Sequence, residues 1–193
     1  MIVDGLILAA GESRRMGSHK PLLPFRGQTF LDTLIETFAR HCRSVTVVLG
    51  HDAAKIRSGL QRAKQATFIE NPDYRSGQLS SLQAGLRALP HAQQILLTLA
   101  DHPAVDHATL AALLSAPAVL AIPRYQGRHG HPICFDRALA AELLALPPEA
   151  SARQVIHQHR QDTRFVDVDD AGILVDVDDP AAYAALLRST ASA

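Results

Sequence analysis

The sequence has few of the residues from which aromatic binding surfaces and disulfide frameworks are built. Its 193 residues include no tryptophan, 5% aromatic residues and two cysteines. So few aromatic rings argue against a base-stacking surface for single-stranded nucleic acid. The formal net charge is zero, with 19 basic and 19 acidic residues. This balance argues against a nucleic-acid-binding face and against a basic face for membranes.

The cysteines and the apolar runs exclude further classes. Cys42 and Cys134 lie far apart, outside any CxxC pair or zinc spacing, and Cys134 lies between the apolar Ile133 and Phe135. We expect them to be small core residues. No uninterrupted apolar run approaches the roughly 20 residues of a membrane-spanning helix. Met1-Ile2-Val3-Asp4 lacks the basic segment of a signal peptide, so the sequence predicts a cytoplasmic protein.

What the sequence does contain is an alternation of short apolar runs and helical patterns. Strands are expected at 2–8, 44–49, 66–70, 94–100 and 119–123, and helices at 30–41, 51–60, 80–89 and 106–114. This alternation predicts an α/β protein with a three-layer, Rossmann-like fold, in which helices cover both faces of a mostly parallel sheet. In such sheets, ligands bind beyond the carboxyl ends of the strands.

The regular alternation of predicted strands and helices ends after Pro123. A polar, glycine-rich loop is expected at 124–132, followed by a strand at 133–135 that introduces an antiparallel element. Further helices are expected at 136–146, 151–159 and 181–187, and strands at 164–168 and 175–178. Since no stretch is long enough to be a linker, we expect a single domain over residues 1–193.

The most informative segment follows the first strand. An apolar run leads into the small residues Ala9-Ala10-Gly11, and Arg14, Arg15 and Lys20 come next. Small residues let the backbone approach a ligand, and the N–H groups of such a loop form a concave site for phosphate oxygens. The cations then neutralise phosphate charge. The alternative is a glycine turn with solvated basic residues.

Two phosphate-binding motifs are excluded by spacing. Gly11 and Gly17 are six residues apart and Lys20 precedes Pro21, which does not fit a Walker loop. The three-glycine spacing of a dinucleotide-binding fingerprint is also missing.

Carboxylates follow two of the predicted strands. Asp101 comes directly after the strand at 94–100, where it can bind Mg²⁺ or act as a turn or cap residue. Asp176 and Asp178 are two apart in an expected strand and so would point to the same face. One of them and Asp101 together would chelate one ion, and a solvated acidic turn is the alternative. Asp179, before Pro180, is typical of a helix N-cap.

Two further segments are candidate contacts. The helix expected to begin near Ser80 offers free N–H groups and hydroxyls that suit a base edge, or it is a simple serine-capped helix. His129 and His131 lie together in the glycine-rich loop without an obvious third metal ligand. That loop would contact an anionic substrate or be merely exposed.

In their order and spacing, these blocks resemble the MobA/MocA-like nucleotidyltransferases, most closely the molybdenum cofactor cytidylyltransferases. Leu8 to Lys20 fits the pattern L-A-(A/G)-G-x-S-x-R-M-G-x-x-K without a gap. The weaker blocks are Asn71-Pro72 with 77–86, Ala100-Asp101-His102-Pro103, Gly130-His131-Pro132 with Phe135, and 176–180 with Tyr183. The resemblance covers nearly the whole chain.

The resemblance implies roles for individual residues. It implies a nucleotide-binding half at 1–123, and an acceptor-binding half with the second metal carboxylate at 124–193. The nucleotide contacts would be Leu8, Ala9, Ala10, Gly11, Arg15, Lys20, Gly77, Ser81 and Asp101, of which Arg15, Lys20 and Asp101 are catalytic. Gly130, His131 and Pro132 would face the acceptor. Mg²⁺ would be held by Asp101 and Asp178, with Asp176 as the alternative.

The implied reaction transfers CMP from CTP to the phosphate of a molybdopterin cofactor and releases pyrophosphate. The implied partners are CTP or another NTP, the molybdopterin-type phosphate acceptor, and a molybdoenzyme as a further candidate. Alternatives are a guanylyl or sugar-phosphate nucleotidyltransferase, or a non-catalytic chaperone of the cofactor. Ala9-Ala10-Gly11 favours CTP, because guanylyl relatives tend to have Ala-Gly-Gly. The sequence departs from the family's usual Asp-Gln-Pro at Asp101-His102-Pro103, and from its usual Asp-x-Asp-Thr-Pro at 176–180.

Overall fold

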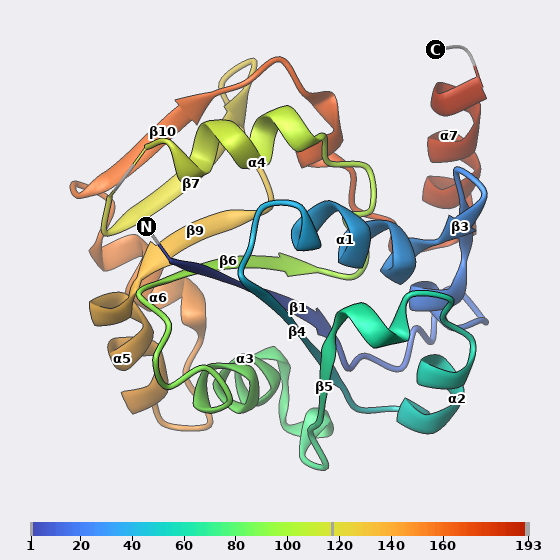
Figure 1. Ribbon diagram of the computed structural model, residues 1–193, viewed down its shortest axis with the longest axis horizontal. Coiled ribbons are helices and arrows are strands. Elements are labelled where there is room, and N and C mark those ends of the chain that lie inside the picture. The colour runs from blue at the N-terminus through green and yellow to red at the C-terminus, as the bar shows by residue number, and fades with distance from the viewer. Residues whose placement is uncertain (1, 117, 192–193) are drawn as a thin grey trace.

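The computed structural model describes residues 2–116 and 118–191 and is built on a mixed sheet (Figure 1). The strand order is β10-β7-β9-β6-β1-β4-β5, and β8 pairs with β7. The strands are β1 Val3–Ala9, β4 Ser44–Leu49, β5 Thr67–Glu70, β6 Gln94–Leu99, β7 Leu120–Tyr125, β8 Arg128–His129, β9 Ile133–Asp136 and β10 Thr163–Asp167.

Most neighbouring strands run parallel. β1 pairs in parallel with both β4 and β6, β4 with β5, and β10 with β7. β9 is antiparallel to β6 and to β7. The predicted mostly parallel sheet with an antiparallel element in the C-terminal half is therefore confirmed. The carboxyl ends of β1 and β6 lie side by side, since Leu8 pairs with Leu99.

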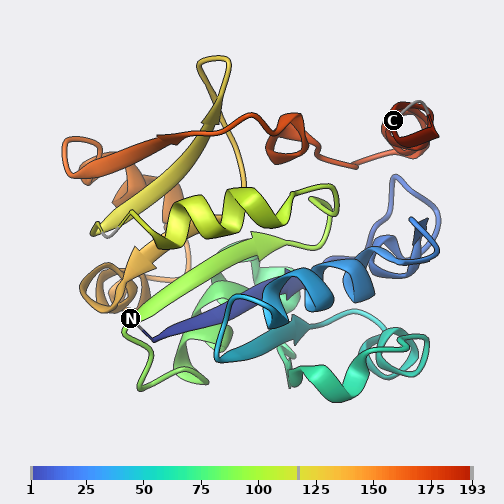
Figure 2. The same ribbon diagram turned by 45° about the horizontal axis from the view of Figure 1, so that its top comes forward.

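Helices cover both faces of the sheet (Figures 1 and 2). One face carries α1 Phe30–Ala39 and α4 His107–Leu114, and the other carries α3 Gln78–Arg87, α5 Arg137–Ala145 and α6 Ala152–Gln158. Successive side chains of a strand point to opposite faces of the sheet, so one strand contributes to both cores. Ile7 belongs to the first core with residues of α1, whereas Leu6 and Leu8 belong to the second core with residues of α3.

A third, smaller core lies beside the sheet. The hairpin of β2 Pro24–Phe25 and β3 Gln28–Thr29 packs near α7 Pro180–Ala191, and Figure 2 shows this helix set apart from the sheet. The members of this core are Met16, Leu23, Phe25, Phe30, Ala104, Val177 and Leu186. The hydroxyl of Tyr183 donates to the carbonyl of Pro24 at 2.7 Å. These contacts hold the segment before α7 close to the first loop of the chain.

The strand expected at 175–178 is wrong. The 3-10 helix Ala171–Leu174 comes before it, and residues 175–178 form no strand. The argument that alternation places Asp176 and Asp178 on one strand face therefore fails. The polar loop expected at 124–132 is also partly wrong, because it contains β8 and a hairpin turn with positive φ at Gln126 and Gly127.

Two helix beginnings differ in their capping. α3 begins at Gln78 with Gly77 at its N-cap, and the Ser80 hydroxyl donates to the carbonyls of Asp73 and Gly77. The serine-capped alternative is therefore wrong. Asp179 accepts from the backbone N–H of Ala182 at 2.9 Å, which confirms its capping role.

Two further expectations concern the cysteines and the membrane. Cys134 is buried, Cys42 is half-buried, and both are free thiols. Within residues 2–116 and 118–191, every helix is too short or too polar to cross a bilayer.

Candidate active site

The loop between β1 and Lys20 is held in shape by its own residues. Ser13 and Gly17 adopt positive φ values of 52° and 68°, and the Met16 side chain is buried in the third core. The hydroxyl of Ser13 accepts from the backbone N–H of Lys20 at 3.1 Å. Lys20 thus begins its short 3-10 helix, Lys20–Leu22, at a fixed place beside the carboxyl end of β1.

Gly11 has no packing reason to be glycine. A Cβ at this position would meet nothing within 4 Å, so a larger residue would fit the protein itself. By contrast, a Cβ at Gly85 would come 2.5 Å from Cδ1 of Leu6. A glycine that faces open space beside a cationic loop suits close approach of a ligand to the backbone.

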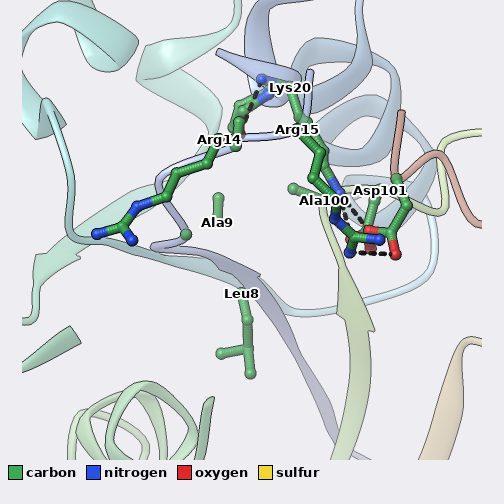
Figure 3. A pocket seen from close by; sticks show the side chains of 11 residues that line it. Leu8, Ala9, Arg14, Arg15, Lys20, Ala100 and Asp101 are labelled. Atoms are coloured by element: carbon green, nitrogen blue, oxygen red, sulfur yellow. Dashed lines mark hydrogen bonds and ion pairs between the residues drawn. The ribbon is translucent and has the colours of Figure 1, made fainter. Parts of the chain in front are cut away.

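The basic side chains converge on two carboxylates from distant parts of the chain. Nζ of Lys20 lies 2.7 Å from Oδ1 of Asp178 and 3.3 Å from Oδ2 of Asp101. Nη2 of Arg15 lies 2.6 Å from Oδ2 of Asp178. Hydrogen bonds from Lys20 and then from Arg15 hold the pKa of Asp178 below its usual value. The three predicted catalytic residues, Arg15, Lys20 and Asp101, therefore share one site (Figure 3).

Arg14 is directed elsewhere. Figure 3 shows its side chain pointing away from Asp101, and it pairs with Glu12. Arg75 also bonds Glu12, at 3.0 Å. The two arginines lower the pKa of Glu12 to about 2. This cluster links the loop to the 3-10 helix Tyr74–Ser76.

Three cavities adjoin one another along the carboxyl ends of β1 and β6. The first, of about 210 Å³, is lined by Leu8, Ala9, Gly11, Ser13, Arg14, Arg15, Lys20, Pro21, Ala100, Asp101 and Asp178. The second, of about 240 Å³, shares Leu8, Gly11 and Asp101 with the first and adds Gly77 and Ser81 among others. The structure thus brings the predicted phosphate and base residues to one cleft.

The third cavity, of about 480 Å³, opens on the side of α3, α5 and α6. It shares Leu8, Gly77, Gln78 and Leu99 with the second cavity. Its inner wall is apolar, with Leu82, Leu97, Ile133, Leu139 and Leu143 among the lining residues. His131, a predicted acceptor contact, also lines it.

The loop around His131 is fixed by close packing. A Cβ at Gly130 would lie 2.0 Å from the carbonyl oxygen of Ile173, so this glycine is required by the neighbouring backbone. The peptide between His131 and the buried Pro132 is cis. Burial lowers the pKa of His131 to about 4. His129 stacks on Phe165 with ring centroids 4.3 Å apart, so the two histidines do not form a metal pair.

A group of metal-ligating side chains lies beside Lys20. One ligand atom each from Asp101, His102 and Asp176 fall within 4.8 Å of one another. Burial lowers the pKa of His102, and partial burial together with the nearby Asp101 raises the pKa of Asp176. Oδ1 of Asp101 is buried, and no hydrogen-bond partner for it is present among the described residues. Such an orphaned carboxylate oxygen fits a divalent cation.

His102 is the site residue that the sequence did not single out. Its ring lies 4.7 Å from that of His131, although 29 positions separate them in the chain. The available signal was the departure from the family pattern directly after Asp101.

The cleft fits a known protein family. The family model described as "MobA-like NTP transferase domain" matches residues 5–163. The chain belongs to this family. The match includes the loop before Lys20, Asp101 and the segment around His131, while Asp176 and Asp178 lie beyond it.

Individual relatives of this MobA-like NTP transferase have different names. It is 30% identical to the molybdenum cofactor cytidylyltransferase of Escherichia coli (strain K12), with 92% of each chain covered. It is 31% identical to the nicotine blue oxidoreductase of Paenarthrobacter nicotinovorans, over 91% of this chain and 92% of that protein. A solved structure of Rv0371C in complex with manganese, from Mycobacterium tuberculosis H37Rv, aligns with a TM-score of 0.82 and 29% identity. That alignment covers 98% of this chain and 100% of the other.

Proposed function

We propose that this nucleotidyltransferase moves CMP from CTP to the phosphate of a molybdopterin-type acceptor and releases pyrophosphate. The observation that carries the proposal is the convergence of Lys20, Arg15 and Asp101 on one cleft at the carboxyl ends of β1 and β6. The similarity to the cytidylyltransferase of Escherichia coli supports the choice of reaction.

The first cavity suits the triphosphate. Backbone N–H groups of Ala10 and Gly11 would approach phosphate oxygens, and Lys20 and Arg15 would neutralise their charge. An oxygen of the acceptor phosphate attacks the α-phosphorus, and the bond from that phosphorus to pyrophosphate breaks. A phosphate monoester is largely ionised near neutral pH, so the step needs no general base. The protein chiefly has to hold two anions together in line.

Asp101 would hold Mg²⁺ together with Asp178 or Asp176. The buried, unpartnered Oδ1 of Asp101 supports its role as a ligand. When bound, a divalent cation supplies positive charge to the phosphate oxygens. The manganese complex of the mycobacterial relative is consistent with a divalent cation in this fold.

The second and third cavities suit the base and the acceptor. Gly77 and Ser81 would lie near the base, where Asn71 donates to the Ser81 hydroxyl at 3.0 Å and fixes it. Ala9-Ala10-Gly11 favours cytosine over guanine. The third cavity has the size and the apolar wall for the ring system of the acceptor, and His131 lines it; Gly130 and Pro132 are not among its lining residues and would act by positioning His131.

The test is pyrophosphate release by the full chain with each of the four NTPs, with and without molybdopterin. We expect release with CTP and molybdopterin. Lys20→Ala should lower turnover by roughly 100-fold or more, because a preorganised charge at the reacting phosphate is lost. Lys64→Ala removes an exposed lysine outside the cavities and is the matched control. Normal release by both Lys20→Ala and Asp101→Ala would refute the assignment.

The same panel separates the alternatives. Pyrophosphate release with GTP and molybdopterin indicates a guanylyltransferase. Pyrophosphate release with a sugar phosphate as acceptor indicates a sugar-phosphate nucleotidyltransferase. Binding of finished cofactor without any turnover indicates a chaperone.

A further inference from the structure

The carboxylate of Asp101 faces two different environments. Its Oδ2 accepts from Nζ of Lys20 at 3.3 Å. Its Oδ1 is buried, and the described part of the chain offers it no hydrogen-bond partner. Nε2 of His102 lies 3.8 Å from this Oδ1. The second oxygen of Asp101 is thus free for a ligand on the side away from Lys20.

His102 is fixed on that side. The residue is 7% exposed, and its backbone N–H donates to the carbonyl of Leu99 at 3.2 Å. Nδ1 of its ring is buried and has no hydrogen-bond partner among residues 2–116 and 118–191. The ring nitrogen nearer Asp101 is Nε2, 3.8 Å from the unpartnered Oδ1, and a buried imidazole next to an unpartnered carboxylate oxygen is typical of a metal-ligand set.

Asp176 completes the group from the other end of the chain. The buried Val177 donates its backbone N–H to the carbonyl of Asp101 at 3.0 Å. This hydrogen bond holds residues 176–178 next to Asp101. On one side of Val177, Asp178 bonds Lys20 and Arg15. On the other side, Asp176 joins Asp101 and His102, with the three ligand atoms within 4.8 Å of one another. Donors on opposite sides of a small divalent cation lie about 4.2 Å apart, so a slight contraction would let one ion bridge all three.

We propose that Asp101, His102 and Asp176 are the protein ligands of the divalent cation, and that the imidazole makes this site prefer Mn²⁺ to Mg²⁺. Mg²⁺ favours an all-oxygen shell, whereas first-row transition metals accept imidazole nitrogen as well as carboxylate oxygen. Asp178 is not a ligand in this proposal, because it pairs with Lys20 and Arg15. The use of this ion in catalysis rests on the proposed nucleotidyl transfer, but its binding does not.

The experiment titrates Mn²⁺ into the full chain without nucleotide and follows the free ion by EPR, with Mg²⁺ as competitor. Wild type should bind Mn²⁺ more tightly than Mg²⁺. His102→Gln should lower Mn²⁺ affinity by roughly tenfold or more and leave Mg²⁺ affinity nearly unchanged. Asp176→Asn should weaken both ions, and Asp178→Asn neither. Pulsed EPR should detect a directly bound nitrogen in wild type and in the control His129→Gln, and none in His102→Gln. Circular dichroism confirms that each variant is folded.

The inference is overturned by any of three results. These are no bound Mn²⁺ at millimolar concentrations, no nitrogen coupling in wild type, or loss of the ion in Asp178→Asn with retention in Asp176→Asn. Its failure is distinguishable from that of the proposed function. Mn²⁺ binding through His102 without nucleotidyl transfer would support the metal site and contradict the proposed function. Nucleotidyl transfer without nitrogen coupling would support the proposed function and contradict the role of His102 as a ligand.

Discussion

Nζ of Lys20 lies 2.7 Å from Oδ1 of Asp178, so the lysine of the loop after β1 is paired with a carboxylate from the C-terminal segment. Arg15 contacts the other oxygen of the same carboxylate at 2.6 Å. An arriving triphosphate would therefore compete with Asp178 for both cations. Binding of the triphosphate would break the ion pairs of Asp178 and replace them with ion pairs between the phosphates and the same two cations.

This competition predicts that Asp178→Asn binds inorganic pyrophosphate more tightly than wild type does in the absence of metal. Asp178 is partly exposed, so its ion pairs are worth at most about 1 kcal/mol, which is roughly fivefold in affinity. Calorimetric titration of pyrophosphate in the presence of EDTA measures the effect. Asp169→Asn neutralises an exposed aspartate outside the cavity and serves as control. Equal or weaker binding by Asp178→Asn would show that the pair does not compete with phosphate.

Gly11 and Gly85 are glycines for different reasons, ligand approach in the first case and core packing in the second, and substitutions at both positions test this. Gly11→Ala should leave the free energy of unfolding nearly unchanged, because the new methyl group meets open space, and should weaken CTP binding, because it occupies the path of the phosphates. Gly85→Ala should cost about 1–3 kcal/mol of stability, because its methyl group would overlap Leu6 and Val48 in the second core. Urea unfolding and CTP titration of both variants check this. Normal CTP binding by Gly11→Ala would remove the argument that this glycine serves the ligand.

The meeting of Lys20 and Asp101 in one cleft was predictable because both residues follow strand ends. The loop of Gly11 and Lys20 follows one buried strand and Asp101 follows another, and parallel strands present their carboxyl ends at one edge. The structure has Lys20 and Asp101 in contact there. No long-range information beyond the α/β alternation was needed.

The carboxylates near the C-terminus were harder to place, because long-range packing fixes them. Alternating polarity at 175–178 suggested a strand, but the segment pairs with no strand and is held by the burial of Val177 in the third core. As a result Asp176 and Asp178 have different neighbours. The contact between His102 and His131 likewise depends on β9 lying next to β6, which local sequence patterns do not reveal.

The two thiols should be unreactive in the folded protein. Burial raises the pKa of Cys42 and of Cys134 to about 12, so at pH 8 only about one thiol in 10⁴ is a thiolate. Both pKa values lie above the ordinary value of 9.0. The stability contributed by the protonated thiols is therefore complete below pH 9 and is lost as the pH rises from 9 towards 12. Reaction with a thiol reagent at pH 8, with and without urea, measures their protection. Rapid labelling without urea would contradict it.

The anchoring of the C-terminal segment predicts a functional effect of a core substitution. Val177 is fully buried between Asp176 and Asp178, so Val177→Ala should cost about 1–3 kcal/mol of stability through the cavity it leaves. It should also lower Mn²⁺ affinity and the rate of pyrophosphate release, because both aspartates depend on this anchor for their position. Leu187→Ala truncates a side chain of α7 that is 39% exposed and should change neither quantity. The measurements are Mn²⁺ titration and turnover well below the unfolding temperature of each variant. If Val177→Ala is less stable but binds Mn²⁺ and turns over like wild type, packing at this position does not set the geometry of the carboxylates.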